Sequence, residues 1–232
     1  MDAGTTCRNA PLPRLAGALW LLAGMTYLAC EAAAAAAFPG YSYARNYISD
    51  LGVPYTALID GRVIHSPLAW LMNFSGFILD GLLSAAAAVT TIIAVGARQR
   101  GGRAFLLLWI VHAAGSILVG TVHSGPREVA AGIGHFHVIG AAMAIIGGNA
   151  ALLAAANLAR KCGASSRYPA ASLGLGLCGF FGPALLEATR VTGWALVPDG
   201  VSERASVYAI TLWKLMTGLA LLFAARRRPA PA

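Results

Sequence analysis

Six long apolar runs, separated by shorter polar connections, form the main pattern of the chain. They cover residues 15–38, 67–95, 104–122, 134–159, 169–190 and 203–225. Each run is about long enough to cross a bilayer as a helix, for which about 20 residues suffice. The pattern predicts an all-α polytopic membrane protein, a six-transmembrane-helix bundle in one integral membrane domain over residues 1–232. The first run also fits a cleavable signal peptide, but its length favours a retained span.

Composition supports a membrane protein and narrows its partners. Apolar residues make up 58% of the chain and charged residues 11%, with a mean hydropathy of +0.67, whereas a soluble domain has about 25% charged residues. The net charge is +8, but the basic residues form short clusters between the runs, so we expect no nucleic-acid partner. The four cysteines show no metal-ligand spacing, and we expect buried apolar roles for Cys7, Cys30, Cys162 and Cys178.

The distribution of basic residues predicts an orientation. Eleven Lys and Arg residues flank one side of the predicted bundle and five flank the other. The larger group comprises Arg8, Arg14, Arg98, Arg100, Arg103, Arg160, Lys161, Arg167, Arg226, Arg227 and Arg228. Because basic flanks stay in the cytoplasm, both termini are predicted to be cytoplasmic in a multi-pass protein of the cell (inner) membrane. The connection 39–66 is then extracytoplasmic.

Polar side chains also stand inside the apolar runs, where each is costly and therefore a functional candidate. They are Asn73, Asp80, His112, Asn149 and Lys214. Helical spacing aligns them with polar residues nearer the outer ends, in the pairs Asp80–Asn73, His112–His123, Lys214–Glu203 and Asn149–His135. The spacing predicts polar stripes that converge on a cavity open to the extracytoplasmic side. The alternatives are a structural Asp80–Lys214 pair, a packing histidine and interhelical amide bonds.

A second polar group is predicted at the outer surface. It contains Asn46, Ser49, Asp50, His65, His123, His135, His137, Glu203 and Arg204. Histidine with carboxylate suits a zinc site or a general acid–base pair, and His123, His135 and Asp50 are the candidate ligands. His135 and His137 point to opposite sides of a regular helix, so at most one faces a cavity. Interfacial histidines and Ser49 as a turn cap, rather than a nucleophile, are the alternatives.

Several of these segments resemble a bacterial and archaeal membrane family, domain-of-unknown-function family 998. They are residues 46–52 (Asn-Tyr-Ile-Ser-Asp-Leu-Gly), 65–80 and 120–123, with Gly134-His135 and Glu203-Arg204. The first motif is also similar to the Tyr-Ile-Ser-Asp signature of Frag1/DRAM/Sfk1 proteins, which implies a six-helix lipid-associated protein. A more distant similarity, to alkaline ceramidases and progestin-type receptors, implies zinc held by Ser, Asp and three His. This chain lacks a clear His-x-x-x-His in its last span, where Lys214 stands.

These features lead to two functional hypotheses. The first is a protein that binds a lipid or lipid-linked substrate from the outer side, or processes it by hydrolysis or acyl transfer. Zinc is the candidate cofactor of this protein. Its catalytic residues would be Asp50, Asp80, His123 and His135, and its substrate-binding residues Asn46, Ser49, His65, Asn73, Glu203, Arg204 and Lys214. The second is a transporter or proton-coupled channel with a relay of Asp80, His112 and Lys214. A structural partner of another membrane protein is a third.

Overall fold

The computed structural model describes residues 11–59, 61–96 and 100–226 and contains six membrane-length helical spans. Five are single helices: α1 (Pro11–Ala37), α4 (Arg100–Thr121), α6 (Gly134–Lys161), α7 (Arg167–Thr192) and α8 (Asp199–Arg226). The remaining span joins α2 (Ala69–Leu71), the π-helical η2 (Met72–Leu79) and α3 (Asp80–Val95). Each span agrees with a predicted run to within about one helical turn. The predicted polytopic all-α fold is therefore confirmed.

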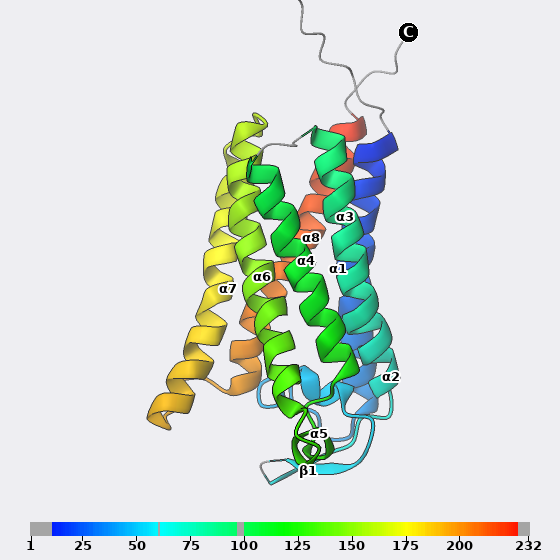
Figure 1. Cartoon of the computed structure of the whole chain (residues 1–232), viewed down its shortest axis with the longest axis vertical. Helices are drawn as coiled ribbons and strands as arrows, with labels where there is room; N and C mark the ends of the chain where they lie inside the picture. Colours follow the sequence, from blue (N-terminus) through cyan, green and yellow to red (C-terminus); the bar gives the residue numbers. More distant parts are fainter. Residues whose placement is uncertain (1–10, 60, 97–99, 227–232) are drawn as a thin grey trace, which may run out of the picture.

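The spans pack as a closed ring. Around it, α3 contacts α1, α1 contacts α8, α8 contacts α7, α7 contacts α6, α6 contacts α4, and α4 returns to α3. The chain begins and ends its described part at the same end of the bundle, where α1 starts beside the end of α8 (Figure 1). The first and last spans are thus direct neighbours.

The two ends of the ring differ in character. One, called the basic end below, carries Arg14, Arg103, Arg160, Lys161, Arg167 and Arg226. The other, the loop end, carries the short helix η1 (Ser49–Gly52), the hairpin of β1 (Ala57–Ile59) and β2 (Arg62–Ile64), and α5 (Pro126–Ala130) (Figure 1). Arg8, Arg98, Arg227 and Arg228, which contribute to the predicted orientation, and Cys7 lie outside the described residues. The cytoplasmic placement of the basic end stays a prediction.

An aromatic cluster fills the ring at its centre on the side of the basic end. Trp20, Phe105, Trp109 and Trp213 are each at most 1% exposed, and the ring centroids of Trp20 and Trp109 lie 4.6 Å apart. Trp20 Nε1 donates to Thr91 Oγ1 at 3.0 Å. The cluster joins α1, α3, α4 and α8 by dense packing, which is what holds membrane helices together where lipid removes the hydrophobic driving force.

Small residues decide where the helices approach. A methyl group at Gly140 of α6 would lie 3.0 Å from the Gly115 carbonyl oxygen of α4, so these two backbones are nearly in contact. The expected burial of the cysteines holds for Cys30 but is wrong for Cys162 and Cys178, which are exposed. Cys162 caps the end of α6, and Cys178 lies within α7 on a side that no other described helix covers.

Candidate functional site

The deepest polar group joins three helices in the middle of the ring. Lys214 Nζ of α8 donates to both carboxylate oxygens of Asp80 at 2.7 and 2.9 Å. His112 of α4 places Nε2 3.5 Å from Lys214 Nζ and 3.8 Å from Asp80 Oδ2. All three residues are at most 5% exposed. The structure therefore brings together Asp80, His112 and Lys214, called the triad below.

The hydrogen bonds fix which nitrogen of His112 carries the proton. Nδ1 lies 2.7 Å from the Ala144 carbonyl oxygen, which only accepts, so Nδ1 is protonated. Nε2 then faces Lys214 as an acceptor, and the imidazole is neutral. The triad carries one negative and one positive charge. Removal of either charge would leave the other buried and unpaired, which costs several kcal/mol.

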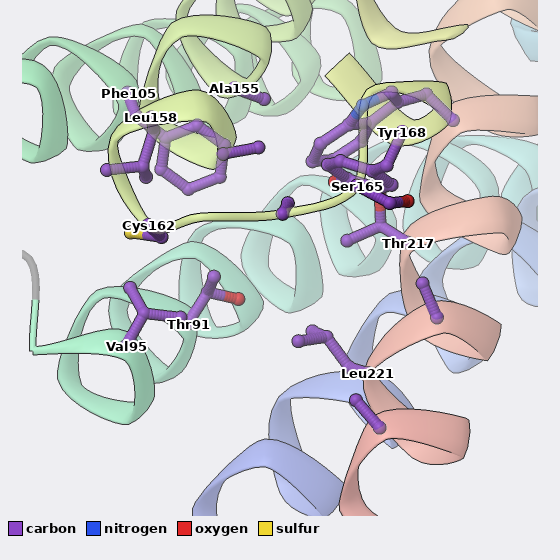
Figure 2. A pocket seen from close by; sticks show the side chains of 15 residues that line it. Thr91, Val95, Phe105, Ala155, Leu158, Cys162, Ser165, Tyr168, Thr217 and Leu221 are labelled. Atoms are coloured by element: carbon purple, nitrogen blue, oxygen red, sulfur yellow. Dashed lines mark hydrogen bonds between the residues drawn. The ribbon is translucent and has the colours of Figure 1, made fainter. Parts of the chain in front are cut away.

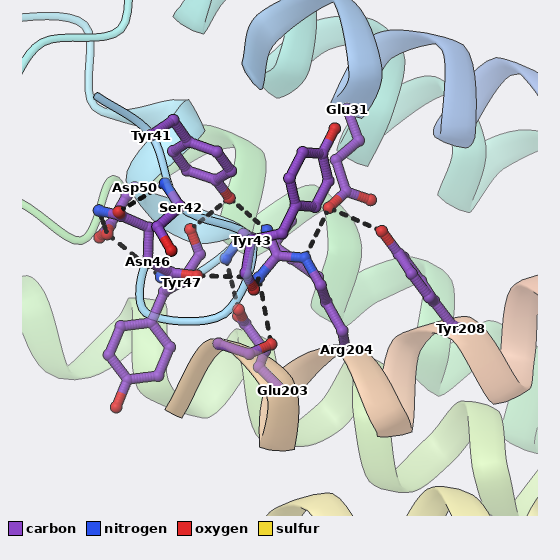
Figure 3. A network of polar contacts seen from close by, with 12 residues as sticks. Glu31, Tyr41, Ser42, Tyr43, Asn46, Tyr47, Asp50, Glu203, Arg204 and Tyr208 are labelled. Atoms are coloured by element: carbon purple, nitrogen blue, oxygen red, sulfur yellow. Dashed lines mark hydrogen bonds and ion pairs between the residues drawn. The ribbon is translucent and has the colours of Figure 1, made fainter. Parts of the chain in front are cut away.

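Arg204 of α8 organises a second network, at the loop end (Figure 3). Its Nε donates to Glu31 Oε1 of α1 at 3.0 Å, and Tyr208 donates to the same oxygen at 3.1 Å. Its Nη1 donates to the carbonyl oxygens of Tyr43 (2.7 Å), Asn46 (2.8 Å) and Gly200 (3.1 Å), and Nη2 donates to the Tyr41 hydroxyl. The guanidinium fork suits this many planar acceptors. Arg204 thus fastens the first connection to both α1 and α8.

The motif at residues 46–52 folds on itself within this network. Asn46 Nδ2 and the Tyr47 amide both donate to Asp50 Oδ2, at 2.9 and 3.2 Å, and Asn46 Oδ1 accepts from the Ser42 amide. Burial raises the pKa of the Asp50 carboxyl, although the bond from Asn46 and the charge of Arg62 oppose it. Asp50 is 3% exposed. Its observed contacts are those of a turn cap that holds the loop in shape.

Other predicted residues also anchor the first connection. Glu203 accepts from the Ile48 amide, and Asn73 Nδ2 donates to the Gly52 carbonyl oxygen at 2.8 Å. The Ser49 carbonyl oxygen accepts from Ser124 Oγ at 3.3 Å. These contacts connect the segment to η2, α8 and the connection before α5, so the predicted substrate-binding residues of this region hold the loop in place.

A third group joins the hairpin region to α5. Glu128 accepts from the Tyr55 hydroxyl and lies 3.0 Å from His123 Nδ1. Burial alone would raise the pKa of Glu128, but the bonds from Tyr55 and His123 lower it below its ordinary value. The Arg127 guanidinium stacks 4.0 Å from the centroid of the Tyr55 ring. His123 is therefore a partner of Glu128 and not of Asp50.

The other histidines are separated from this group. His137 is the inward-facing member of its pair and holds the Val122 carbonyl oxygen at 2.6 Å from Nδ1, whereas His135 is exposed and stacks on Phe136. Because α6 begins at Gly134, its first turn points His135 outward. His65 is exposed and contacts Thr56. Among the described residues no three His, Cys, Asp or Glu side chains are grouped to hold a metal, so His123, His135 and Asp50 do not fit zinc.

The predicted polar stripes therefore form separate networks, and the cavity open to the extracytoplasmic side stays a prediction. The triad residues bond to one another, and the loop-end residues bond to backbone of the first connection. A pocket of about 340 Å³ lies instead near the basic end, among α3, α4, α6, α7 and α8. Figure 2 shows Thr91 and Val95 on one side, Thr217 and Leu221 on the other, and the α6–α7 connection across its rim.

The pocket is mainly apolar. Phe105 and Trp213 of the aromatic cluster line it, and its few polar groups include Thr217, whose hydroxyl lies 2.8 Å from the Tyr168 hydroxyl. A second cavity of about 240 Å³ adjoins it, shares Val95, Leu158 and Cys162, and is lined by Lys161. An apolar pocket thus lies beside a cavity that is lined by a positive charge.

The sequence pattern of the family described as Protein of unknown function (DUF998) matches residues 21–220. The chain belongs to this family. The match covers all six spans in whole or in part, including Asp50, Asp80, Arg204 and Lys214 of this DUF998 protein. No curated protein and no solved structure matches the chain. The similarities to Frag1/DRAM/Sfk1 proteins and to alkaline ceramidases stay expectations from the sequence.

Sequence reasoning missed several residues that the structure places in the networks of this DUF998 protein. Glu31, Tyr41 and Tyr208 surround Arg204, and Glu128 holds His123. A lone carboxylate in an apolar run is itself a signal, and Glu31 carries it. The tyrosines, and Glu128 in the short helix α5, carry no sequence signal that separates them from ordinary interfacial residues.

Proposed function

We propose that this DUF998 protein binds an anionic phospholipid of the cell membrane in the pocket near the basic end. The observation that carries the proposal is that an apolar pocket of about 340 Å³ and the cavity lined by Lys161 share the lining residues Val95, Leu158 and Cys162. A volume above about 300 Å³ is in the range of small-molecule sites. Membrane lipids are the partners, and the bound lipid would enter from the leaflet at this end.

The lining suits an acyl chain. Along α8 the pocket extends from Trp213 to Ala224, a rise of roughly 16 Å at about 1.5 Å per residue. Phe105 and Trp213 form its inner floor, because both belong to the buried aromatic cluster. A methylene chain gains dispersion contacts with such walls while it displaces no tightly bound polar group.

The positive charge of Lys161 beside the pocket suits a phosphate group. Lys161 Nζ would lie 3.6 Å from a methyl group at Gly101, so the ammonium sits close to the start of α4. Arg103 is exposed on the same helix end. Basic groups at this depth attract anionic lipid with about 1 kcal/mol each. The head group would therefore rest at Lys161 while one chain fills the pocket.

Hydrolysis or acyl transfer is not part of the proposal. The candidate catalytic residues Asp50, His123 and His135 hold different partners, and Asp80 is bound to Lys214. Binding without chemistry requires none of them to reach a substrate.

Lipid retained by the purified protein tests the proposal. Ala220 lines the pocket and its neighbour Leu219 is 47% exposed, so Ala220→Trp fills the site and Leu219→Trp is the matched control. Native mass spectrometry should show one bound anionic phospholipid on the wild type and on Leu219→Trp, and none on Ala220→Trp. Lys161→Gln should lower the preference for anionic over zwitterionic lipid about fivefold, with Arg160→Gln as its control. Equal lipid retention by both tryptophan variants would disprove the site.

A further inference from the structure

We propose that the triad is a proton-exchange site, which takes up one proton at His112 Nε2 from the loop-end side through a buried polar path at Tyr27 and Glu31. This activity is separate from lipid binding at the basic end. The argument rests on the tautomer of His112, on polar atoms that lack partners, and on the aromatic cluster that closes the opposite side.

The triad has one free place for a proton. His112 Nδ1 is occupied by its bond to the Ala144 carbonyl oxygen, and Nε2 is an acceptor 3.5 Å from Lys214 Nζ and 3.8 Å from Asp80 Oδ2. Uptake forms one N–H bond at Nε2 and converts the neutral imidazole to imidazolium. The net charge of the triad then rises from zero to plus one, and the new N–H can donate to Asp80 Oδ2.

The groups that face His112 make this step sensitive to its surroundings. Asp80 of α3 favours the imidazolium, Lys214 of α8 opposes it, and α6 presents the Ala144 carbonyl. The indole of Trp109, on the same helix, lies 5.1 Å from the imidazole centroid. Proton uptake and release thus depend on how closely Lys214 and Asp80 stay paired.

A line of buried polar atoms leads from the triad toward the loop end. The Tyr27 hydroxyl and Glu31 Oε2 are buried and have no hydrogen-bond partner within the described part of the chain. The two residues are four positions apart on α1, so they share a face one turn apart. A methyl group at Gly24 of α1 would lie 3.5 Å from Lys214 Cβ, so this face of α1 packs beside the triad. Tyr27 follows three positions later on the same face, one turn nearer the loop end, between the triad and Glu31.

Such orphaned atoms are where buried water is held. A buried water makes about three hydrogen bonds to otherwise unsatisfied polar groups, and a hydroxyl both donates and accepts, so it can pass a proton along a chain. Glu31 continues the path to Arg204 and Tyr208 at the loop end. The path therefore leads from the triad to the Arg204 network at the loop end.

The aromatic cluster closes the other direction. Along α4, which runs from the basic end to the loop end, Phe105 and Trp109 come before His112. Lys214 Nζ lies 5.7 Å from the Trp109 ring centroid, and Phe105 and Trp213 line the apolar pocket beyond. Ser84 Oγ and Trp109 Nε1 are also buried without a partner on this side, but Phe105 and Trp213 pack against Trp109 and stand between these atoms and the pocket. We therefore expect protons to reach the triad from the loop-end side.

Trp109 supplies the measurement, because a protonated imidazole quenches a neighbouring indole. The full protein is placed in vesicles of defined orientation, and the pH on one side is lowered from about 8 to about 5, the range in which histidine titrates. When the loop-end side is acidified, we expect the fluorescence to fall along a titration curve for one proton. When only the basic-end side is acidified, the fluorescence should not change. His112→Gln should abolish the response.

Tyr27→Phe tests the path without disturbing the triad. It removes only an unpartnered hydroxyl, so the protein should fold and the amplitude should be kept, while the response slows about a hundredfold. Tyr43→Phe is the matched control and should leave the rate unchanged, because Tyr43 is 45% exposed and contributes its backbone carbonyl, not its hydroxyl, to the Arg204 network. A response to the basic-end pH, an unaltered response in folded His112→Gln, or wild-type speed in Tyr27→Phe would overturn the proposal. A wild type that does not respond at all would overturn it as well.

Discussion

Arg204 is a buried arginine that binds three separate parts of the protein at once. It is 5% exposed, and its three guanidinium nitrogens reach a carboxylate, a phenol and three carbonyl oxygens that belong to α1, the first connection and α8. The rings of Tyr43 and Tyr41 also flank the guanidinium at 4.9 and 5.5 Å. The shape of the side chain, and not its charge alone, makes this arrangement possible.

Arg204→Lys should therefore destabilise the protein although the charge is kept. A lysine ammonium has three donors and no planar fork, so several acceptors lose their partner, and we expect a loss of about 2–3 kcal/mol in unfolding free energy. Arg190 pairs with Glu187 on the exposed end of α7, and Arg190→Lys is the control, with a change near zero. Thermal unfolding in detergent measures both. Equal stability of the two variants would contradict the anchoring role.

Individual residues show which features of the site can be predicted from the sequence and which cannot. Asp80 and Lys214 were predicted as costly buried charges with a structural pair as one alternative, and the structure shows them buried and paired. Their contact joins positions 134 residues apart, and no local pattern encodes which of six similar helices meet. The choice between His135 and His137 depended on where α6 begins, a boundary that sequence leaves uncertain by a turn.

At the scale of elements, the second span departs from the regular helix that the spacing argument assumed. Asn73 lies in the π-helical η2 and Asp80 starts α3. A seven-residue spacing aligns side chains only in a regular α-helix, and here Asn73 bonds to Gly52 while Asp80 bonds to Lys214. No sequence signal marked η2, because π-helical turns follow from packing and not from residue propensity.

The contact between α4 and α6 gives a test at this scale. Gly115 faces the backbone of α6, including the Ala144 amide and the Gly140 carbonyl, so a methyl group there must push the helices apart. Gly115→Ala should cost about 1–3 kcal/mol. Gly174 of α7 has open space around it, and Gly174→Ala should be neutral or stabilising by up to about 1 kcal/mol. Opposite signs in unfolding experiments would support the close crossing, and a harmless Gly115→Ala would refute it.

At the scale of the whole molecule, the number and extent of the spans were predictable, whereas their order around the ring was not. Length and apolarity identify each span by itself. Which helices become neighbours depends on the faces that carry residues such as Gly115, Trp109 or Lys214. Before the fold is known, these faces could be paired in many ways. The pairing of the polar stripes was not predictable for the same reason, because stripes on separate helices can bond to one another or face a common space.

The predicted orientation can be measured with the native Cys162, which is exposed at the basic end. In a variant that keeps Cys162 as its one cysteine, a membrane-impermeant maleimide should label only after the cells are permeabilised, because basic flanks stay in the cytoplasm. A cysteine placed at Leu58, which is 68% exposed in the hairpin, should label in intact cells. Labelling of Cys162 in intact cells would reverse the orientation.

The closure of the ring by α1 and α8 sets an order on biosynthesis. The ribosome releases α8 last, and α8 contributes both cations, Lys214 and Arg204, that neutralise the buried carboxylates Asp80 and Glu31. Until that helix is inserted, the two acids sit in a nascent bundle without their counter-ions, where ionised side chains are costly. Until then, Asp80 and Glu31 are expected to be protonated or bound by an insertion factor. In a chain truncated before α8, these unpaired acids remain in the membrane, and we expect such a chain to be degraded.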